Sequence, residues 1–376
     1  MRDLQELRDE IDVIDEQIAA LYEQRMAISD EVADYKIANG KQVFDQAREK
    51  SKLDKLSAMA SSDFTKTGLI ELFRQLMSMS RKLQYQKLTK YGALGNLPFI
   101  GLDEIPKKDV RIVYQGVPGA YSEKAVCQFF GDDANRFHVA SFKDAMLTIS
   151  DGAADYAVLP IENSTAGIVT ENYDMLSQFE NYIIGEVYVK IAHCLMGLPG
   201  STLADIDVVF SHNQGLMQCH SFLESHPKIT AVEVENTAMA AKMVGTDTKM
   251  NHGAIASAKA ADLYGLTILA EDISEAEENE TRFIIVTNQR VFQKDAKKIS
   301  ISFQIPHEPG SLYRLMSHFI YNGLNMTKIE SRPIPEMQWE YRFFVDFEGN
   351  LADSAVKNAI RGLREEAHNL RILGNY

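Results

Sequence analysis

The sequence predicts a multidomain protein in which an all-α segment is followed by an α/β segment and then by an α+β segment of ferredoxin-like topology. Its 376 residues exceed the size at which a single hydrophobic core keeps growing, so two or three domains are expected. Apolar residues recur with heptad spacing near the N-terminus, whereas from Val110 short β-rich runs alternate with helical stretches.

The composition narrows the functional class. A formal net charge of −14 argues against general nucleic-acid binding, which needs a basic footprint, but it leaves small anionic ligands possible. The N-terminus, MRDLQELRDE, is too acidic for a signal peptide, and no run approaches the roughly 20 apolar residues of a membrane span. The three cysteines have no disulfide or metal-binding spacing, so we expect a cytoplasmic protein without a metal or other cofactor.

The first segment is predicted to be helical throughout. Its heptad stripe predicts one long helix over residues 3–38, ended by Asn39-Gly40. Further helices are expected over residues 45–60 and 67–90, and the stretch from Gly92 to Lys108 is interpreted as a linker.

Two cations in the first helix are candidate ligand-binding residues. The stripe continued from Leu21 reaches Arg25, and a buried guanidinium needs an anionic partner. Lys36 follows eleven residues later, about three turns on, and so lies on nearly the same face. Arg8 alone is typical of a surface residue, but the length of the stripe favours a helical dimer in which a partner chain could bring it to a shared site. A dimerisation coiled coil with unrelated cargo is the alternative, which Arg25 on the stripe argues against.

The second segment is predicted to form a largely parallel sheet. Polar clusters follow several strands, namely GVPGAYSE, IENSTAG and HNQG. In open α/β sheets ligands bind at the carboxyl ends of strands, so these clusters are candidate site residues, although each alone is more typical of turn and cap chemistry. The third segment, residues 299–376, has the order βαββαβ.

The helical segment resembles the helical type of chorismate mutase, through LRDEID, the E-Q-R at Arg25, DYK ending at Lys36, and DQAREK. This resemblance implies that Arg8 of a partner helix completes each site and that Lys36 and Gln84 bond the ether oxygen as catalytic residues. It also implies substrate contacts by Arg25, Arg48, Asp45, Glu49 and Ser80. The chorismate rearrangement is concerted and transfers no proton, so it requires positioning and charge complementarity, and no general base.

The α/β segment resembles the prephenate dehydratase family, most specifically through Thr281-Arg282-Phe283. The family resemblance implies a two-lobed fold of the periplasmic-binding-protein kind, with Thr281 as the residue essential for dehydration. It also implies a site lined by Ser122, Asn163, Ser164, His212, Gln214, Arg282 and Phe283. Our hypothesis is that Thr281 relays a proton to the departing oxygen, supplied by Glu280 or by water.

Residues 299–376 resemble an ACT domain, the βαββαβ module that binds amino acids, through HEPGSLYRL and ESRP. The resemblance implies an effector site that includes Gly310, Ser311, Leu312, Glu330 and Ser331, although Ser311 and Tyr313 depart from the usual G-A-L-V. A ligand carboxylate at the helix N-terminus after Gly310 would meet free N–H groups, while a plain turn is the alternative for Pro309-Gly310 alone.

Together the resemblances imply a bifunctional enzyme of phenylalanine biosynthesis, acting on chorismate and then prephenate, with L-phenylalanine as effector and a homodimer or higher homo-oligomer as assembly. The expected domains are residues 1–91 for the mutase, 110–288 for the dehydratase and 299–376 for the regulatory domain, with 92–109 as linker. Arogenate in place of prephenate, or a binding protein for an amino acid or anion without catalysis, are the alternatives. No partner nucleic acid or membrane is expected.

Overall fold

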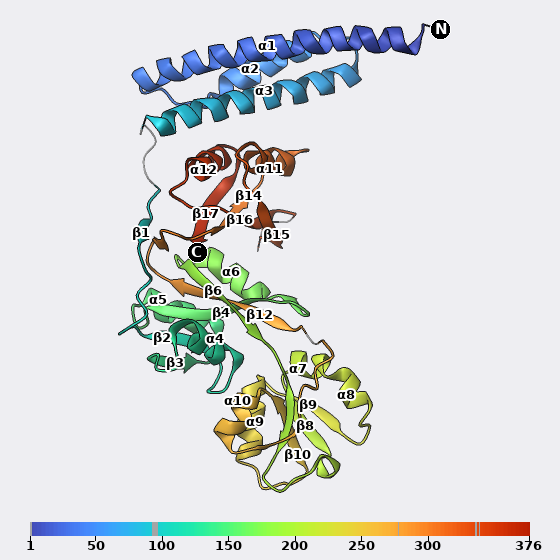
Figure 1. Cartoon of the computed structure of the whole chain (residues 1–376), viewed down its shortest axis with the longest axis vertical. Helices are drawn as coiled ribbons and strands as arrows, with labels where there is room; N and C mark the ends of the chain where they lie inside the picture. The colour runs from blue at the N-terminus through green and yellow to red at the C-terminus, as the bar shows by residue number, and fades with distance from the viewer. Residues whose placement is uncertain (1, 92–96, 277, 335–336, 338) are drawn as a thin grey trace. The chain divides into compact units, whose positions relative to one another are not determined.

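The computed structural model describes residues 2–91, 97–276, 278–334, 337 and 339–376 (Figure 1). Residues 92–96 of the predicted linker lie outside this description. The chain forms two compact units, one of Met1–Pro98 with Ile301–Arg371 and the other of Phe99–Ser300 with Ile372–Tyr376. In the described part of the chain, no helix combines the length and the apolar composition needed to cross a membrane.

The first unit begins with a helical module. Its helices are α1 (Leu4–Ala38), α2 (Gln46–Ser57) and α3 (Asp63–Lys90). The long first helix is confirmed, and the Asp3 carboxylate caps it by accepting from the N–H of Gln5. The predicted start of the third helix at residue 67 is wrong: α3 begins four residues earlier, because Ser62 and Thr65 form a reciprocal capping box.

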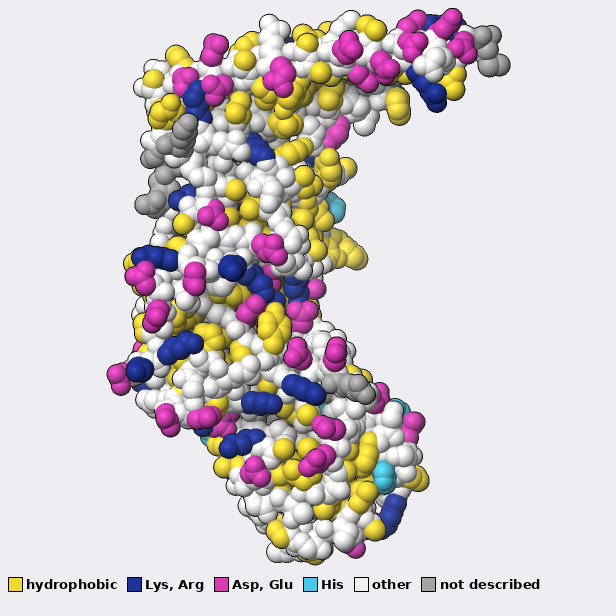
Figure 2. Space-filling view, in the orientation of Figure 1, with side chains coloured by type: hydrophobic (Ala, Val, Ile, Leu, Met, Phe, Trp, Pro, Cys, Tyr) yellow, Lys and Arg dark blue, Asp and Glu magenta, His cyan; other side chains and the backbone are white. Residues whose placement is uncertain are grey.

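Much of the apolar stripe of α1 is exposed in the single chain. The face toward α3 buries small residues, Ser29 and Ala33. The side chains of the stripe are instead 52–63% exposed, and these are Leu4, Ile11, Ile14, Ile18, Leu21 and Ile28. Figure 2 shows such hydrophobic side chains beside acidic ones along α1, at the top of the view. Arg25 lies on this stripe by its spacing, but its long side chain reaches α3, where Nη1 donates to Leu76 and Ser80.

The C-terminal module of the first unit confirms the predicted βαββαβ order. Its elements are β14 (Lys298–Gln304), α11 (Ser311–Tyr321), β15 (Met326–Pro333), β16 (Tyr341–Glu348), α12 (Ser354–Glu366) and β17 (His368–Asn375). The strands lie in the order β15-β16-β14-β17, which is ferredoxin-like. Phe319 of α11 packs edge-on against Phe347 of β16 in its core, with ring centroids 5.1 Å apart. Helix α12 packs on both α11 and α3.

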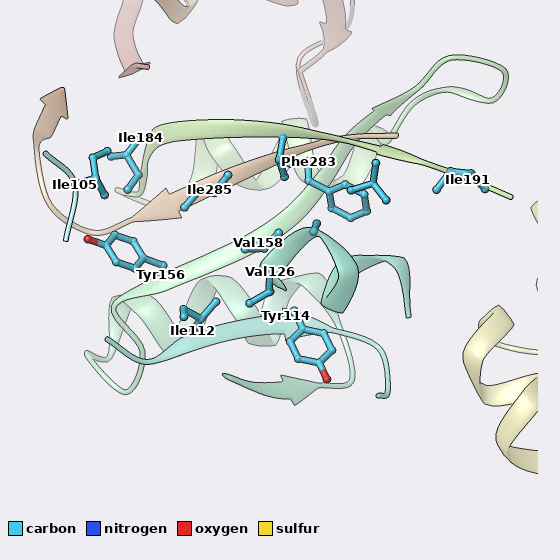
Figure 3. Close-up of a cluster of buried hydrophobic side chains, with 13 residues drawn as sticks. Ile105, Ile112, Tyr114, Val126, Tyr156, Val158, Ile184, Ile191, Phe283 and Ile285 are labelled. Atoms are coloured by element: carbon cyan, nitrogen blue, oxygen red, sulfur yellow. The ribbon is translucent and has the colours of Figure 1, made fainter. Parts of the chain in front are cut away.

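The second unit contains two sheets, and the first is built around β12. Its strands have the order β6-β12-β4-β2-β3, with β5 paired to β4. Their bounds are β2 (Ile112–Gln115), β3 (Arg136–Val139), β4 (Tyr156–Asn163), β5 (Gly167–Ile168), β6 (Tyr182–Lys190) and β12 (Glu280–Thr287). The helices of this lobe are α4 (Tyr121–Phe130), α5 (Phe142–Ser150) and α6 (Thr170–Gln178). Val158, Ile285 and Val126 are fully buried in its core (Figure 3), and each such side chain contributes roughly 1.5–3 kcal/mol by leaving water.

The second sheet has the order β11-β7-β10-β8-β9. Its strands are β7 (Cys194–Gly197), β8 (Val208–Ser211), β9 (Thr230–Glu233), β10 (His252–Ala256) and β11 (Thr267–Ala270). The helices of this lobe are η1 (Leu203–Asp205), α7 (Asn213–Gln218), α8 (His220–Glu224), α9 (Thr237–Gly245) and α10 (Ala258–Tyr264). The apolar run over residues 183–196 supplies strands to both sheets, because β6 ends at Lys190 and β7 begins at Cys194.

The prediction of a largely parallel sheet is wrong, since both sheets are mixed. Strand β12 runs antiparallel to β4 and β6, and β7 runs antiparallel to β10 and β11. The chain crosses from the first sheet to the second after β6 and returns as β12, so the returning strand runs opposite to its neighbours. The predicted linker is also only partly irregular, because β1 (Ile100–Leu102) pairs with β13 (Val291–Gln293).

Candidate active sites

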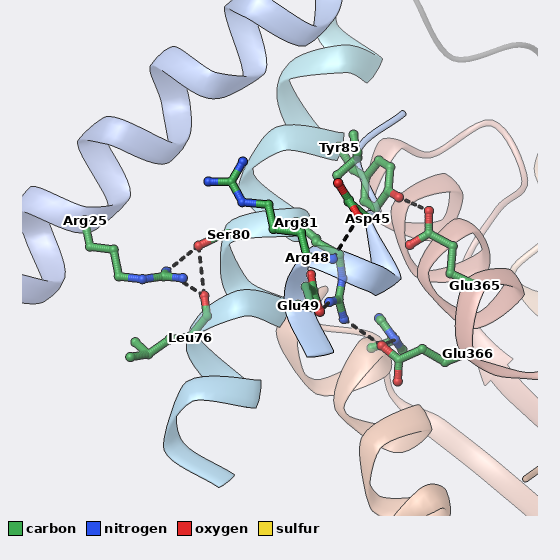
Figure 4. Close-up of polar contacts among 12 residues, drawn as sticks. Arg25, Asp45, Arg48, Glu49, Leu76, Ser80, Arg81, Tyr85, Glu365 and Glu366 are labelled. Atoms are coloured by element: carbon green, nitrogen blue, oxygen red, sulfur yellow. Dashed lines mark hydrogen bonds and ion pairs between the residues drawn. The ribbon is translucent and has the colours of Figure 1, made fainter. Parts of the chain in front are cut away.

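Arg25 anchors the first candidate site between α1 and α3. Its Nη1 donates to Ser80 Oγ at 2.5 Å and to the Leu76 carbonyl at 2.8 Å (Figure 4). Ser29, one turn after Arg25, donates to Ser80 Oγ at 3.1 Å. Burial lowers the pKa of Arg25. The structure thus brings together two of the predicted residues, Arg25 and Ser80, with Ser29 as a contact that the sequence did not reveal.

Lys36 is a half-buried donor and Gln84 is a buried one, and both belong to the helical module. Lys36 Nζ donates to the Val43 carbonyl at 2.6 Å. Burial and the Arg48 charge lower the pKa of Lys36, partly offset by Asp45, Glu49 and Glu365. Gln84 is only 6% exposed, and its Oε1 has no hydrogen-bond partner among the described residues. A buried amide oxygen without a partner is costly, which indicates a place for a ligand.

The remaining predicted mutase residues have different surroundings. Asp45 caps α2 by accepting from the N–H of Arg48 at 3.0 Å, and both side chains are exposed. Glu49 is paired with Arg81, at 2.5 Å between Oε2 and Nη1. Arg8 is exposed and lies seventeen residues before Arg25, roughly 25 Å along the helix, so one chain does not bring it to this cluster.

The second candidate site is organised around Thr281, the second residue of β12. Thr281 faces Asn163 across the β4–β12 pair, and its Oγ1 accepts from Asn163 Nδ2 at 3.0 Å. Asn163 Nδ2 also donates to Asn279 Oδ1 at 2.7 Å. Ser164 Oγ accepts from the N–H of Glu280 at 3.0 Å. The predicted pair Asn163–Thr281 is therefore a direct contact. No pattern in the sequence indicated Asn279, which also bonds Asn163.

Residues outside the first sheet also contact the cluster around Thr281 and Asn163. Gln218, the last residue of α7, donates to Thr165 Oγ1 at 3.0 Å, and its Oε1 lies 3.0 Å from His193 Nε2. Burial lowers the pKa of His193, more strongly than the hydrogen bond to Gln218 raises it, so the imidazole is neutral near pH 7. His193 lies on the crossing between β6 and β7. Its buried position could not be foreseen, because the surrounding apolar run predicts a continuous strand.

Three predicted dehydratase residues are separate from Thr281 in this structure. His212 caps α7, where its Nδ1 accepts from the N–H of Gln214 at 3.2 Å. Ser122 is buried in the first turn of α4. Among the described residues, no hydrogen bond joins Ser122, His212 or Gln214 to Thr281.

Arg282 and Phe283, which are predicted to contact substrate, lie among protein side chains in this structure, and their substrate contacts stay a prediction. Successive strand residues face opposite sides, so Arg282 and Glu280 point away from Thr281. Arg282 Nε pairs with Glu186 Oε2 at 2.7 Å, and its Nη2 donates to Tyr376 Oη at 2.8 Å. Phe283 is 2% exposed within the core. Their surroundings are those of structural residues, and Glu280 does not share the face of Thr281.

The predicted effector residues occupy the start of α11 and strand β15. Gly310 has a φ of 77°, a left-handed conformation that favours glycine, and it precedes the helix. Ser311 is buried and donates to the Glu308 carbonyl at 2.9 Å, while Leu312 is half-buried. Glu330 and Ser331 pair with Phe344 and Phe343 of β16. A hollow of about 370 Å³ lies beside Glu308 and Pro309, and its lining includes Trp339 and Tyr341.

Comparison with known proteins assigns a family to each of the two segments that hold these candidate sites. Residues 7–85 match the family described as chorismate mutase type II, and residues 112–291 match prephenate dehydratase. A bifunctional chorismate mutase/prephenate dehydratase of Aquifex aeolicus is 31% identical, with 100% of this chain and 98% of the relative covered. Arogenate dehydratase/prephenate dehydratase 1 of Arabidopsis thaliana is 38% identical over 71% of this chain and 72% of its own.

A solved structure is also similar. The prephenate dehydratase of Arthrobacter aurescens in complex with L-Phe has a TM-score of 0.67 and 32% identity, covering 71% of this chain and 90% of that chain. Fold and sites therefore define a fusion of a helical chorismate mutase domain with a prephenate dehydratase domain. The chain belongs to the family of bifunctional chorismate mutase/prephenate dehydratases. It is an enzyme with an isomerase domain and a lyase domain.

Proposed function

We propose that the residues around Arg25 and Lys36 bind chorismate and speed its rearrangement to prephenate, and that those around Thr281 convert prephenate to phenylpyruvate. The observation that carries the first assignment is that two half-buried cations, Arg25 and Lys36, and the buried Gln84 amide lie within the residues that match chorismate mutase type II. Chorismate carries two carboxylates, which suit the guanidinium of Arg25 and that of Arg48.

The mutase step needs no proton transfer, and this agrees with the residue types in the first site. Lys36 is a half-buried cation. It would stabilise the negative charge that develops on the ether oxygen as the C–O bond breaks. The Gln84 amide would donate to the same oxygen. Arg8 would enter from a second chain, for which the exposed apolar stripe of α1 provides the contact surface.

The dehydratase step loses water and carbon dioxide, and prephenate dianion consumes one proton to give phenylpyruvate. Because Asn163 donates to Thr281 Oγ1, the hydroxyl proton of Thr281 is not used in that bond. It is available for the departing ring hydroxyl, with the ring carboxylate leaving as carbon dioxide. A hydroxyl alone is too weak an acid, so a water molecule would restore its proton.

The substrate of the second step has one close alternative. Arogenate differs from prephenate in carrying an amino group in place of the keto oxygen of the side chain. The plant relative is named for both dehydratase activities. We favour prephenate because the helical module of the same chain would supply it.

The proposal also includes regulation, assembly and location. The C-terminal module would be an ACT domain that binds L-phenylalanine beside Gly310, where helix N–H groups complement a carboxylate. The solved relative was crystallised with that amino acid. A homodimer or higher homo-oligomer in the cytoplasm would bury the α1 stripe, and the free cysteines suit a reducing compartment.

Two substitutions test whether the two reactions take place at separate sites. Lys36→Ala should remove at least 99% of the mutase rate and leave prephenate dehydration within twofold of the unsubstituted rate, because the two sites share no residue. Thr281→Ala should do the reverse. Each variant is assayed separately with chorismate and with prephenate. Loss of both activities in either folded variant would contradict the assignment of two separate sites.

A further inference from the structure

Arg81 of α3 joins the mutase site to the C-terminal module. Its side chain is only 9% exposed, although it carries a full charge. One of its nitrogens, Nη1, lies 2.5 Å from Glu49 Oε2, and the other, Nη2, lies 2.7 Å from Glu366 Oε1 of α12 (Figure 4). A single guanidinium therefore bridges a predicted substrate-binding carboxylate and a carboxylate of another module.

The contact between α3 and α12 extends over several turns. Tyr85 of α3 donates to Glu365, and Thr89 donates to Asn358 at 3.0 Å. Glu365 also acts on Lys36, whose pKa its charge raises against the lowering by burial. Two neighbouring carboxylates of α12 thus influence the mutase site.

Glu366 is connected in turn to the segment around Gly310. His318 of α11 lies 3.3 Å from Glu366 Oε1 through its Nε2. Arg314, one turn earlier, donates to the Pro309 carbonyl at 3.1 Å and to Ser311 Oγ at 3.1 Å. Burial raises the pKa of Glu366, but His318, Arg81 and Arg314 together lower it, which leaves the group ionised. The charge of Arg314 acts on Glu366, and the ion pairs of Arg81 connect Glu366 to Glu49.

We propose that Arg81 is a positioning residue of the mutase reaction, and that ligand binding beside Gly310 changes chorismate binding through Glu366 and Arg81. The inference rests on the proposed function, since it assumes a mutase site at Glu49 and an effector at the start of α11. Glu49 can contact a substrate hydroxyl in one fixed orientation only while Arg81 holds it. A shift of α12 that draws Arg81 toward Glu366 would leave the partly buried Glu49 carboxylate without the cation that orients it.

Substitution of Arg81 tests the positioning role. Arg81→Gln should raise KM for chorismate at least tenfold with a smaller change in kcat, because binding depends on the orientation of Glu49. Arg81→Lys, which keeps one charge, should restore part of the affinity. Arg74→Gln makes the same change at an exposed position of α3 and serves as the matched control. Prephenate dehydration in each preparation reports whether the chain is folded. Equal KM values for Arg81→Gln and Arg74→Gln would overturn the role of Arg81.

Substitution of Glu366 tests the coupling. L-Phenylalanine should raise KM of the unsubstituted mutase, and Glu366→Gln should reduce this effect at least fivefold while phenylalanine still binds by calorimetry and still inhibits dehydration. A full mutase response in Glu366→Gln would overturn the coupling. So would a mutase in the unsubstituted chain that is insensitive to phenylalanine at concentrations that suppress dehydration. Failure of the unsubstituted chain to consume chorismate would instead refute the proposed function itself.

Discussion

At the scale of single residues, the role proposed for Lys36 depends on its charge. Burial and Arg48 lower its pKa, and the nearby carboxylates only partly restore it. The protonated amine is the form that can donate to the ether oxygen, and it is lost as pH rises through this lowered value. The position of Lys36 therefore makes a specific prediction for the alkaline side of the pH profile.

We expect mutase kcat/KM to fall at alkaline pH with an apparent pKa below the value of about 10.4 for an unperturbed lysine. The measurement is kcat/KM for chorismate against pH, with circular dichroism to confirm folding at each point. In Lys36→Gln the low residual rate should lack this alkaline decline. A profile that stays level beyond the ordinary lysine pKa would contradict the assigned role of the Lys36 ammonium group.

Thr281 allows a similarly local prediction. Thr281→Val keeps the shape of the side chain and removes the hydroxyl, so the dehydration rate should drop by roughly 10²–10⁴-fold, the range for a lost proton-transfer group. Thr281→Ser retains the hydroxyl, so its dehydration rate should stay close to that of the unsubstituted protein. The test compares kcat for prephenate in the two variants. Equal rates would mean that the hydroxyl takes no part in the reaction.

At the scale of secondary-structure elements, the exposed stripe of α1 predicts how the chains associate. Ile18→Glu places a charge in the stripe, so we expect a shift toward monomer in analytical ultracentrifugation. We also expect loss of most mutase activity, since the proposal has Arg8 enter the site from a second chain. Gln17→Glu adds the same charge at the neighbouring position and should change neither property. An Ile18→Glu chain that remains fully dimeric would rule out the stripe as the interface.

Periodicity in the sequence was sufficient for α1, whose apolar residues recur at helical spacing, and for the βαββαβ order of the C-terminal module. It could not locate the start of α3, where the Ser62–Thr65 capping box decides the boundary. Nor could it find Arg81, whose partner Glu366 is 285 residues away in the chain. The direction of β12 depends on how the chain comes back from the second sheet to the first. Such features follow from tertiary packing and leave no local pattern.

In the candidate sites too, some residue contacts could be predicted from the sequence and others could not. Arg25 with Ser80, and Asn163 with Thr281, were predicted as members of one site each, and the structure places each pair in contact. The prediction of substrate contacts for Arg282 and Phe283 followed from their position next to Thr281 in the sequence. Strand alternation turns Arg282 away from the Thr281 hydroxyl, and Phe283 is buried in the core.

At the scale of the whole molecule, the central claim is that one chain performs two consecutive reactions. The most direct test is to incubate the purified protein with chorismate and follow chorismate loss and phenylpyruvate formation by absorbance, then to repeat the assay with prephenate and with added L-phenylalanine. The account predicts phenylpyruvate from both substrates, with its formation suppressed by phenylalanine. Prephenate that accumulates from chorismate without forming phenylpyruvate would contradict the account, and arogenate would then be the substrate to test in the second site.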